Sequence, residues 1–149
     1  MGVYFFDTSA LVKRYYEEPG TETVDDLIES NESVVISSLS IIETTSAFRR
    51  KYNRDEMTED EMTTLLSEFF TEALEDFIIV PLEESLLEFS FSLVLDDDLR
   101  TLDSLQLSAA LSLDTDEESP VFVCADSDLT AVAAGRGLET IVPQDATAE

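Results

Sequence analysis

Four acidic side chains stand out from the 34 in this 149-residue chain because of the sequence around them. Asp7 ends the apolar run "VYFFD", and Asp126 directly follows the run "VFVCA". Glu43 lies in "SSLSIIETTSAFRR" and Asp103 in "LRTLDSLQLSAAL". Mg²⁺ and Mn²⁺ prefer carboxylate oxygens, and such an ion can activate water and neutralise the charge that develops when a phosphodiester is cleaved. The four acids together therefore indicate metal-assisted hydrolysis at a phosphate.

Each of these acids, taken alone, also has a simpler explanation. Asp7 and Asp126 precede helix-like segments, and Asp is a common cap of a helix N-terminus. Glu43 lies beside an apolar stripe, as many surface residues do, and Asp103 near a helix start is favoured by the helix dipole. The sequence leaves both explanations open for every single residue, so the prediction of a site depends on the four occurring together.

Short apolar runs alternate with longer helix-like stretches, which is typical of an α/β fold with a mostly parallel sheet. We expect strands at 3–7, 33–37, 77–80, 121–125 and 140–142 and helices at about 9–17, 21–30, 38–54, 58–75, 82–95, 101–113 and 127–135. Ligands of such sheets bind beyond the carboxyl ends of the strands, where strand order reverses. Asp7 and Asp126 would lie at those ends.

Two helices are expected to bury one stripe each, from the helical spacing of their side chains. The stripes comprise Ile41, Thr45, Phe48 and Tyr52 in one helix and Leu102, Leu105, Ala109 and Leu113 in the other. Glu43 falls on a different face, which it shares with Ala47, Arg50 and Arg54.

The charge balance is extreme, with eight Lys and Arg and a net charge of −26, while 44% of the residues are hydrophobic. This content predicts one folded domain spanning 1–149, and the charge argues against nucleic-acid binding through bulk attraction. Salt screens repulsion among surface acids, so we expect a protein of a high-salt cytoplasm, as in halophiles, whose melting temperature rises with KCl. We see no membrane helix or signal peptide, and we expect a cytoplasmic protein.

Histidine is absent and Cys124 is the only cysteine, which argues against a zinc site and rules out an internal disulfide. Cys124 lies within "VFVCA", so we expect it to be a small core residue.

The stretches "FFDTSALVKRYYEEPG", "SSLSIIETTSAFRR", "LRTLDSLQLSAAL" and "VFVCADSDLTAVAAGRGLETIVP" carry the four acids in order. Over about residues 3 to 143, the chain resembles PIN-domain proteins of the VapC type, the toxin ribonucleases of toxin–antitoxin pairs. The resemblance implies a three-layer α/β/α sandwich with a central, mostly parallel sheet of four to five strands. It also implies an endoribonuclease with Mg²⁺ or Mn²⁺ as cofactor, RNA as substrate, a small cognate antitoxin as partner, and a homodimer.

By matching motifs, Asp7, Glu43, Asp103 and Asp126 would be the metal and catalytic carboxylates. Asp128 is either a further acid of the pocket or an early-helix acid favoured by the dipole. Thr8 and Ser9 either support Asp7 through hydrogen bonds or cap the first helix.

Positive charge is scarce, so its position is informative. Between Asp55 and Leu99 the chain has 15 acids and no Lys or Arg. The predicted RNA contacts are the cations that flank the motif acids, namely Lys13, Arg14, Arg50, Arg54 and Arg100. The alternative for these cations is ion pairing with the many surface acids.

Three alternatives to a metal-dependent ribonuclease also fit an α/β fold with an acidic pocket. A phosphatase of the haloacid dehalogenase type needs a second Asp two residues after the first, where this chain has Ser9, and a response-regulator receiver needs a late lysine, but none follows Lys51. A non-catalytic PIN-like module that binds RNA or protein stays open, although all four acids are present.

Overall fold

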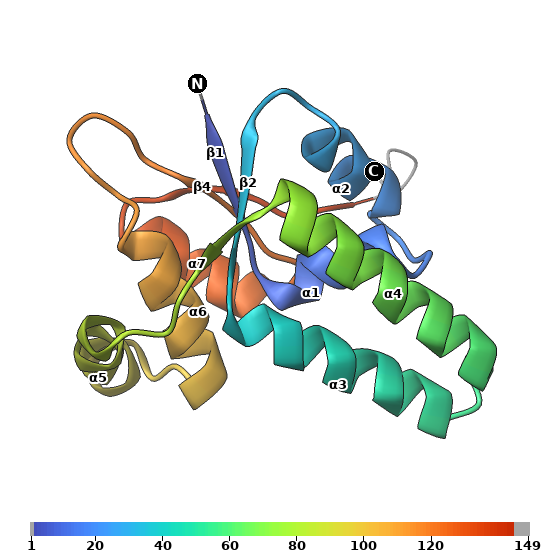
Figure 1. Cartoon of the computed structure of the whole chain (residues 1–149). Coiled ribbons are helices and arrows are strands. Elements are labelled where there is room, and N and C mark those ends of the chain that lie inside the picture. The colour runs from blue at the N-terminus through green and yellow to red at the C-terminus, as the bar shows by residue number, and fades with distance from the viewer. Residues whose placement is uncertain (1, 145–149) are drawn as a thin grey trace.

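A five-stranded, wholly parallel sheet forms the centre of the computed structural model, which describes residues 2–144 (Figure 1). The strands are β1 (Val3–Phe6), β2 (Ser33–Ser37), β3 (Ile78–Val80), β4 (Val121–Val123) and β5 (Glu139–Ile141). Their order across the sheet is β3-β2-β1-β4-β5. All five predicted strands are confirmed to within two residues, and β1 is the central strand.

Seven α-helices and one 3₁₀ turn connect the strands within the described residues. They are α1 (Thr8–Leu11), η1 (Val12–Arg14), α2 (Thr21–Ile28), α3 (Leu39–Asn53), α4 (Glu59–Asp76), α5 (Glu84–Asp97), α6 (Thr101–Leu111) and α7 (Ser127–Gly135). The predicted helix at 9–17 is corrected to a short helix followed by a 3₁₀ turn. The amides of Tyr15 and Tyr16 both bond to the carbonyl of Val12, which ends that turn.

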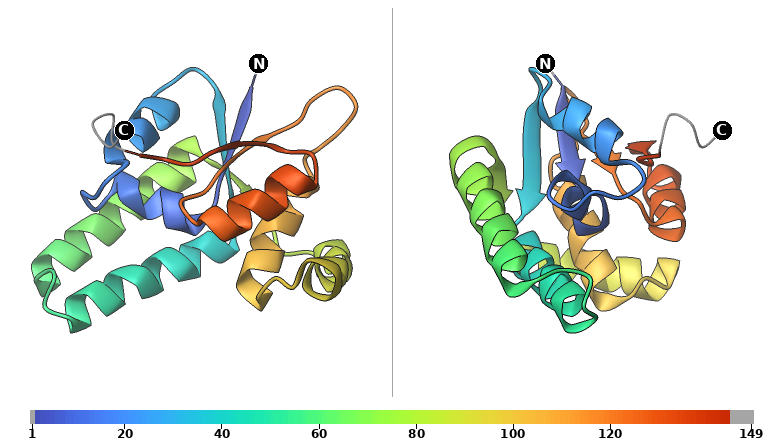
Figure 2. Two further views of the ribbon diagram at one scale, coloured as in Figure 1. Left: turned by 180° about the vertical axis from the view of Figure 1, so that it is seen from behind. Right: turned by 90° about the vertical axis from the view of Figure 1, so that its right-hand side faces the viewer.

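Strand side chains alternate between two cores, as the two-residue period of a pleated strand requires. Phe5 and Phe122, whose rings stack at 6.0 Å, face a core formed with α5, α6 and α7. Phe6 and Val123 face the opposite core, formed with α1, α2 and α4. Helices therefore cover both faces of the sheet, and the predicted three-layer α/β/α arrangement is confirmed (Figure 2).

The long α3–α4 hairpin extends beyond the sheet and has its own small core of Val12, Phe48 and Met57. The start of α4 is fixed by a capping box, in which Thr58 and Glu61 bond to each other's backbone amides. Because α3 begins at the carboxyl end of β2, it brings its first turns toward the carboxyl ends of β1 and β4 (Figure 1).

The predicted helix stripes are only partly right. The buried side chains of α3 are Ser40, Thr44 and Phe48, whereas Ile41, Thr45 and Tyr52 are partly exposed. In α6, Leu105 and Ala109 are buried, but Leu102 is 48% exposed. Two polar side chains thus occupy the inner face of α3, a pattern that hydrophobic spacing alone does not reveal.

One turn depends on a glycine. Gly20 precedes α2 with φ of 98°, and a Cβ there would lie 2.8 Å from the carbonyl oxygen of Pro143. Only glycine fits this left-handed backbone so close to another segment. Within residues 2–144, no helix has the length and apolar character that crossing a membrane requires.

Candidate active site

The candidate site lies at the carboxyl ends of β1 and β4, the neighbouring strands between which the strand order reverses. The amide of Asp7 donates to the carbonyl of Val123 at 2.9 Å, so the ends of the two strands are held together. Asp7 then caps α1, and Asp126 caps α7. The capping explanation is therefore confirmed for both residues, and their role in a metal site stays a prediction.

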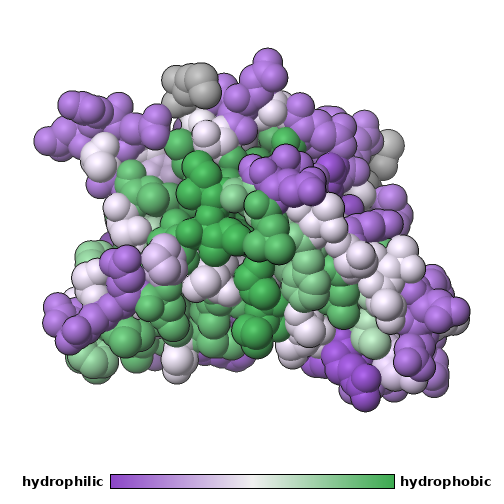
Figure 3. All heavy atoms as spheres, in the orientation of Figure 1, coloured by the Kyte–Doolittle hydropathy of each residue, from purple (hydrophilic) through white to green (hydrophobic). Residues whose placement is uncertain are grey.

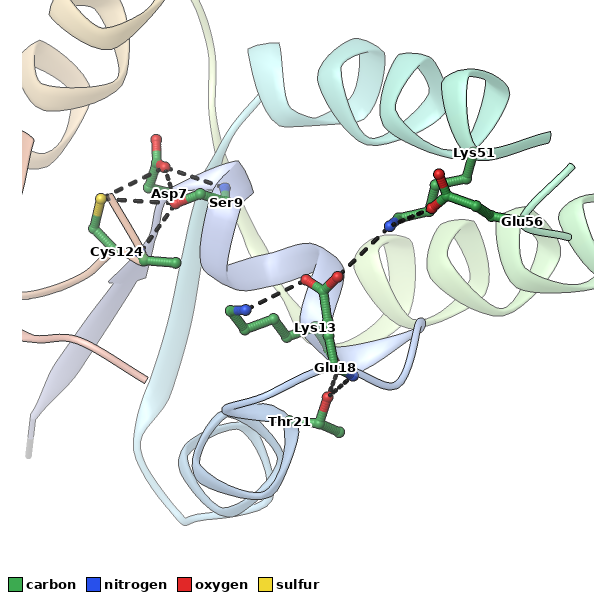
Figure 4. Close-up of polar contacts among 9 residues, drawn as sticks. Asp7, Ser9, Lys13, Glu18, Thr21, Lys51, Glu56 and Cys124 are labelled. Atoms are coloured by element: carbon green, nitrogen blue, oxygen red, sulfur yellow. Dashed lines mark hydrogen bonds and ion pairs between the residues drawn. The ribbon is translucent and has the colours of Figure 1, made fainter. Parts of the chain in front are cut away.

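Asp7 is the most deeply buried acid of the site, with 5% of its surface exposed. Its Oδ2 accepts hydrogen bonds from the amide of Ser9 at 3.1 Å and from the Ser9 hydroxyl at 2.6 Å (Figure 4). The pKa of Asp7 is raised to about 6, mainly by burial and to a smaller extent by the negative charges of Glu43 and Asp103, against the lowering effect of the Ser9 hydrogen bonds. The carboxylate is thus held in place but costly to ionise without a cation.

Ser9 links Asp7 to the segment after β4. Its hydroxyl oxygen accepts from the amide of Ala125 at 3.0 Å while the hydroxyl donates to Asp7. The sulfur of Cys124 lies 3.7 Å from Asp7 Oδ2, and burial, followed by the Asp7 charge, raises the pKa of that thiol to about 12. Cys124 is therefore a neutral, buried side chain, as predicted, although it also contacts the site.

Glu43 is half-buried on α3, and its Oε1 accepts two hydrogen bonds. The donors are the Thr8 hydroxyl at 2.8 Å and the Gln106 side-chain amide at 2.6 Å. Thr8 forms no hydrogen bond to Asp7 among the described residues, which corrects the expectation that it supports Asp7. Thr8 supports Glu43 instead.

Asp103 and Asp126 face a shared hollow of about 220 Å³, which Arg100 and Asp128 also line. Burial raises the pKa of Asp103, and the charges of Asp126 and Glu43 raise it further, whereas the Arg100 charge lowers it. Since Asp103 also raises the pKa of Asp7, the four predicted acids form one group of mutually repelling charges. Asp128 lies at the edge of this group and donates its backbone amide to Asp126.

The donor set fits a hard divalent ion, because it consists of carboxylate oxygens with no nitrogen ligand. In residues 2–144, however, no three of these acids are close enough to form a complete metal-binding group by themselves. Mg²⁺ usually takes only one or two carboxylates and keeps several waters, so it can bind to a loosely spaced set of this kind.

Larger hollows lie elsewhere, two of them around Arg14 and Glu72 with volumes of about 500 and 450 Å³. The cation there is already paired, since Arg14 contacts Asp25, Glu29 and Glu72 at 2.5–3.1 Å. Size alone therefore does not mark the site, and the smaller hollow is the one that the motif acids Asp103 and Asp126 line.

The predicted RNA-binding cations differ in their surroundings. Lys13 pairs with Glu18 (Figure 4), and Arg54 pairs with Glu56. For Lys13, Arg14 and Arg54 the structure therefore shows the ion pairs that the sequence left as the alternative, and their contact with RNA stays a prediction. Among the described residues, the cations without a salt bridge are Arg49, Arg50 and Arg100. Arg100 lines the acidic hollow.

Gln106 was not singled out from the sequence, although its amide is the closest donor to Glu43. It is 1% exposed in a leucine-rich helix, three residues after Asp103. A polar residue at that spacing from a motif acid, on the same side of the helix, was the available signal.

A family model described as the PIN domain matches residues 4–135. The chain belongs to the PIN domain family. Solved structures with the same fold include a toxin–antitoxin complex from Klebsiella pneumoniae, at 16% identity and a TM-score of 0.66, covering 95% of this chain and 98% of that one. VapBC2 from Rickettsia felis, bound to promoter DNA, has 16% identity and a TM-score of 0.63, covering 94% and 98%.

A third similar PIN-fold structure is the Mycobacterium tuberculosis toxin VapC20, which cleaves the sarcin–ricin loop. It is 14% identical, with a TM-score of 0.63, covering 88% of this chain and 95% of that one. Among curated proteins, none matches the sequence. At these identities the likeness establishes the fold, and the chemistry must be inferred from the site.

Proposed function

We propose that this PIN domain is a Mg²⁺- or Mn²⁺-dependent endoribonuclease, the toxin component of a type II toxin–antitoxin pair. The observation that carries the proposal is the burial of Asp7 beside Glu43 and Asp103 with no Lys or Arg bonded to any of the three, among residues 2–144. Such a group is electrostatically incomplete, and a divalent cation would complete it.

The residues that would hold the ion are Asp7, Glu43, Asp103 and Asp126, with Asp128 at the edge of the same hollow. The ion would lower the pKa of a bound water and neutralise charge on the scissile phosphate. Ser9 fixes Oδ2 of Asp7, and Thr8 fixes Oε1 of Glu43. Both carboxylates are therefore already held in position before a metal ion binds.

Contact with RNA is proposed to come first from Arg100 and Arg50. Arg100 lies at the hollow, and Arg50 is exposed on the α3 face that carries Glu43. Because phosphate contacts position a nucleic acid without reading its bases, two such cations near the acids could hold the phosphates that flank the scissile bond. The remaining surface, with its 15 acids between Asp55 and Leu99, would repel RNA.

The proposed partners are a small antitoxin and a second copy of the chain. The toxin–antitoxin complexes among the similar folds support the first. Support for the second comes from exposed apolar side chains of α5, such as Phe91 at 68% and Leu95 at 80%. Apolar residues also gather in the middle of the face in Figure 3, around β3. Light scattering in molar KCl would test the homodimer, and a monomeric mass at high protein concentration would refute it.

The proposed activity is tested by an RNA cleavage assay in molar KCl with Mg²⁺, with Mn²⁺ or with EDTA. Substrates would be a sarcin–ricin loop oligonucleotide and total ribosomal RNA. We expect metal-dependent cleavage that falls more than about 100-fold in Asp7→Asn, since a metal-binding carboxylate is lost. Asp116→Asn is the matched control, because Asp116 is an exposed loop acid.

The non-catalytic alternative gives a different result in the same experiment. A module that only binds RNA would show no cleavage with either metal and equal RNA affinity for wild type and Asp7→Asn. That outcome would overturn the proposed ribonuclease.

A further inference from the structure

Gln106 lies at the centre of a buried polar cluster that joins three helices. Its Nε2 is 2.6 Å from Glu43 Oε1, 2.9 Å from Ser40 Oγ and 3.0 Å from Thr8 Oγ1. The side chain comes from α6, whereas Thr8 belongs to α1 and the other two to α3. Thr8, Ser40 and Gln106 are all at least 91% buried, so water cannot replace these contacts freely.

The hydrogens of this cluster can be assigned to one consistent chain. An amide nitrogen has two N–H groups, and a contact of 2.6 Å to a carboxylate oxygen requires one of them to donate to Glu43. The second N–H donates to Ser40, the Ser40 hydroxyl donates to Thr8 at 2.8 Å, and the Thr8 hydroxyl donates to Glu43 at 2.8 Å. Every donor is used, and both paths end on Glu43 Oε1.

The remaining amide atom of Gln106 is left without a partner. Its Oε1 is buried and accepts no hydrogen bond among the described residues. A buried, unsatisfied carbonyl is destabilising, and an apolar side chain of similar size would avoid that cost. If the amide were turned over, Oε1 would instead face the Glu43 carboxylate. Two acceptor oxygens would then repel each other, so this orientation is less stable. The orientation of the Gln106 amide is thus set by its hydrogen bond to Glu43, although this orientation leaves the Gln106 Oε1 without a hydrogen bond.

We infer that Gln106 is a positioning residue, which orients the Glu43 side chain with Oε1 fixed and Oε2 available to a divalent cation. The inference rests on the proposed metal-dependent function. Because α6 also carries Asp103 one turn earlier, a single helix supplies one acid to the hollow and the donor that orients another. Gln106 therefore sets the metal affinity of the site without contacting the metal.

The test is Mn²⁺ binding, measured from the free-ion signal in electron paramagnetic resonance, in molar KCl and without RNA. Gln106→Met keeps an unbranched chain of similar volume and removes both N–H donors. We expect its Mn²⁺ affinity to fall roughly tenfold or more, the range typical of a lost partner of a metal ligand. Gln106→Leu serves the same purpose if the methionine variant does not fold.

The matched control is Ser108→Ala. Ser108 is equally buried in α6, but its hydroxyl contacts Ser90 at 2.8 Å and not the acids. A general loosening of α6 would weaken Mn²⁺ binding in both variants, whereas a positioning role affects Gln106→Met alone. Thr8→Val, which removes the other hydroxyl donor to Glu43, is expected to weaken binding in the same direction, and the double variant should lose less than the product of the two single effects.

The outcomes separate this inference from the function on which it rests. No Mn²⁺ binding by wild type overturns the proposed metal-dependent ribonuclease. Normal binding by wild type and equally tight binding by folded Gln106→Met overturns the positioning role only. In the cleavage assay, restoring kcat of Gln106→Met with excess Mn²⁺ at an unchanged KM for RNA would support it, since the RNA contacts are not altered.

Discussion

The PIN domain contains two groups of acids that are built in opposite ways. At the ends of β1 and β4, Asp7, Glu43 and Asp103 lie together without a bonded cation, and the pKa values of Asp7 and Asp103 are raised. In the second group, between η1, α2 and α4, three carboxylates surround one guanidinium. There burial would raise the pKa of Glu72, but hydrogen bonds from Arg14 and Tyr15 outweigh burial and lower it.

The difference shows which acidic cluster needs a cation that the chain itself does not supply. The second group, which comprises Asp25, Glu29 and Glu72 around Arg14, is satisfied by its own cation and contributes to folding. The first group opposes folding when it is fully ionised, unless an ion binds to it. In a protein with 34 acids, burial of neighbouring carboxylates without a bonded cation is therefore a better sign of a site than acidity itself.

The largest expected effect is a gain in stability when Asp7 is neutralised without metal. The pKa of Asp7 in the folded chain, about 6, lies above its ordinary value of 3.8, so the folded state binds more protons between those pH values. Stability is therefore lost as pH rises through that window, by up to about 3 kcal/mol above it. Asp7→Asn should recover most of this at pH 8 and little at pH 4, measured by urea unfolding in EDTA at constant KCl. A lower unfolding free energy for Asp7→Asn at pH 8 would contradict the comparison.

Metal should stabilise only the uncompensated group. At a free Mn²⁺ concentration 100 times its dissociation constant, the unfolding free energy of wild type is expected to rise by about 2.7 kcal/mol. Asp7→Asn should show almost no such rise, and Asp116→Asn should behave as wild type. Thermal melts across a Mn²⁺ titration measure this, and an equal shift in both Asp variants would place the ion elsewhere.

Removing Arg14, the cation of the second group, should destabilise the folded protein. Arg14→Met leaves the partly buried Asp25 and Glu72 and the exposed Glu29 without a cation. We expect a loss of about 2 kcal/mol in unfolding free energy at pH 8, less than for a fully buried pair. Arg50→Met is the control, since Arg50 is exposed and forms no salt bridge among the described residues. If Arg14→Met also abolished the Mn²⁺ shift, the two groups would not be independent.

The smallest effect concerns RNA binding by the cations that acids do not hold. Arg50→Ala or Arg100→Ala, made in the Asp7→Asn background to prevent cleavage, should weaken RNA binding severalfold and reduce the salt slope by about 1. Arg14→Met should have a smaller effect on both, because three carboxylates already pair with the Arg14 charge. Fluorescence anisotropy of a labelled RNA at several KCl concentrations measures both quantities, and an unchanged slope for Arg50→Ala and Arg100→Ala would remove them from the interface.

Much of the fold was predictable from the sequence because burial imposes a regular pattern. Runs such as "VYFF" and "SVVIS" fill both faces of a covered sheet, and their apolar character alone identifies the strands. Helix faces were harder to predict. The inner face of α3 includes Ser40 and Thr44, although polar residues usually face solvent. The burial of Ser40 is explained by its hydrogen bonds with Gln106 and Thr8.

The sequence by itself determined the order of the elements and the acids that end their strands, because strand ends and motif spacing are local properties of the chain. The tertiary structure decided which charges are compensated. Arg14 meets Glu72 across 58 residues, and Gln106 meets Glu43 across 63. Such partners depend on how separate helices are rotated and packed, which is fixed by the whole core, so residues alike in sequence became a paired structural cluster in one place and an uncompensated site in another.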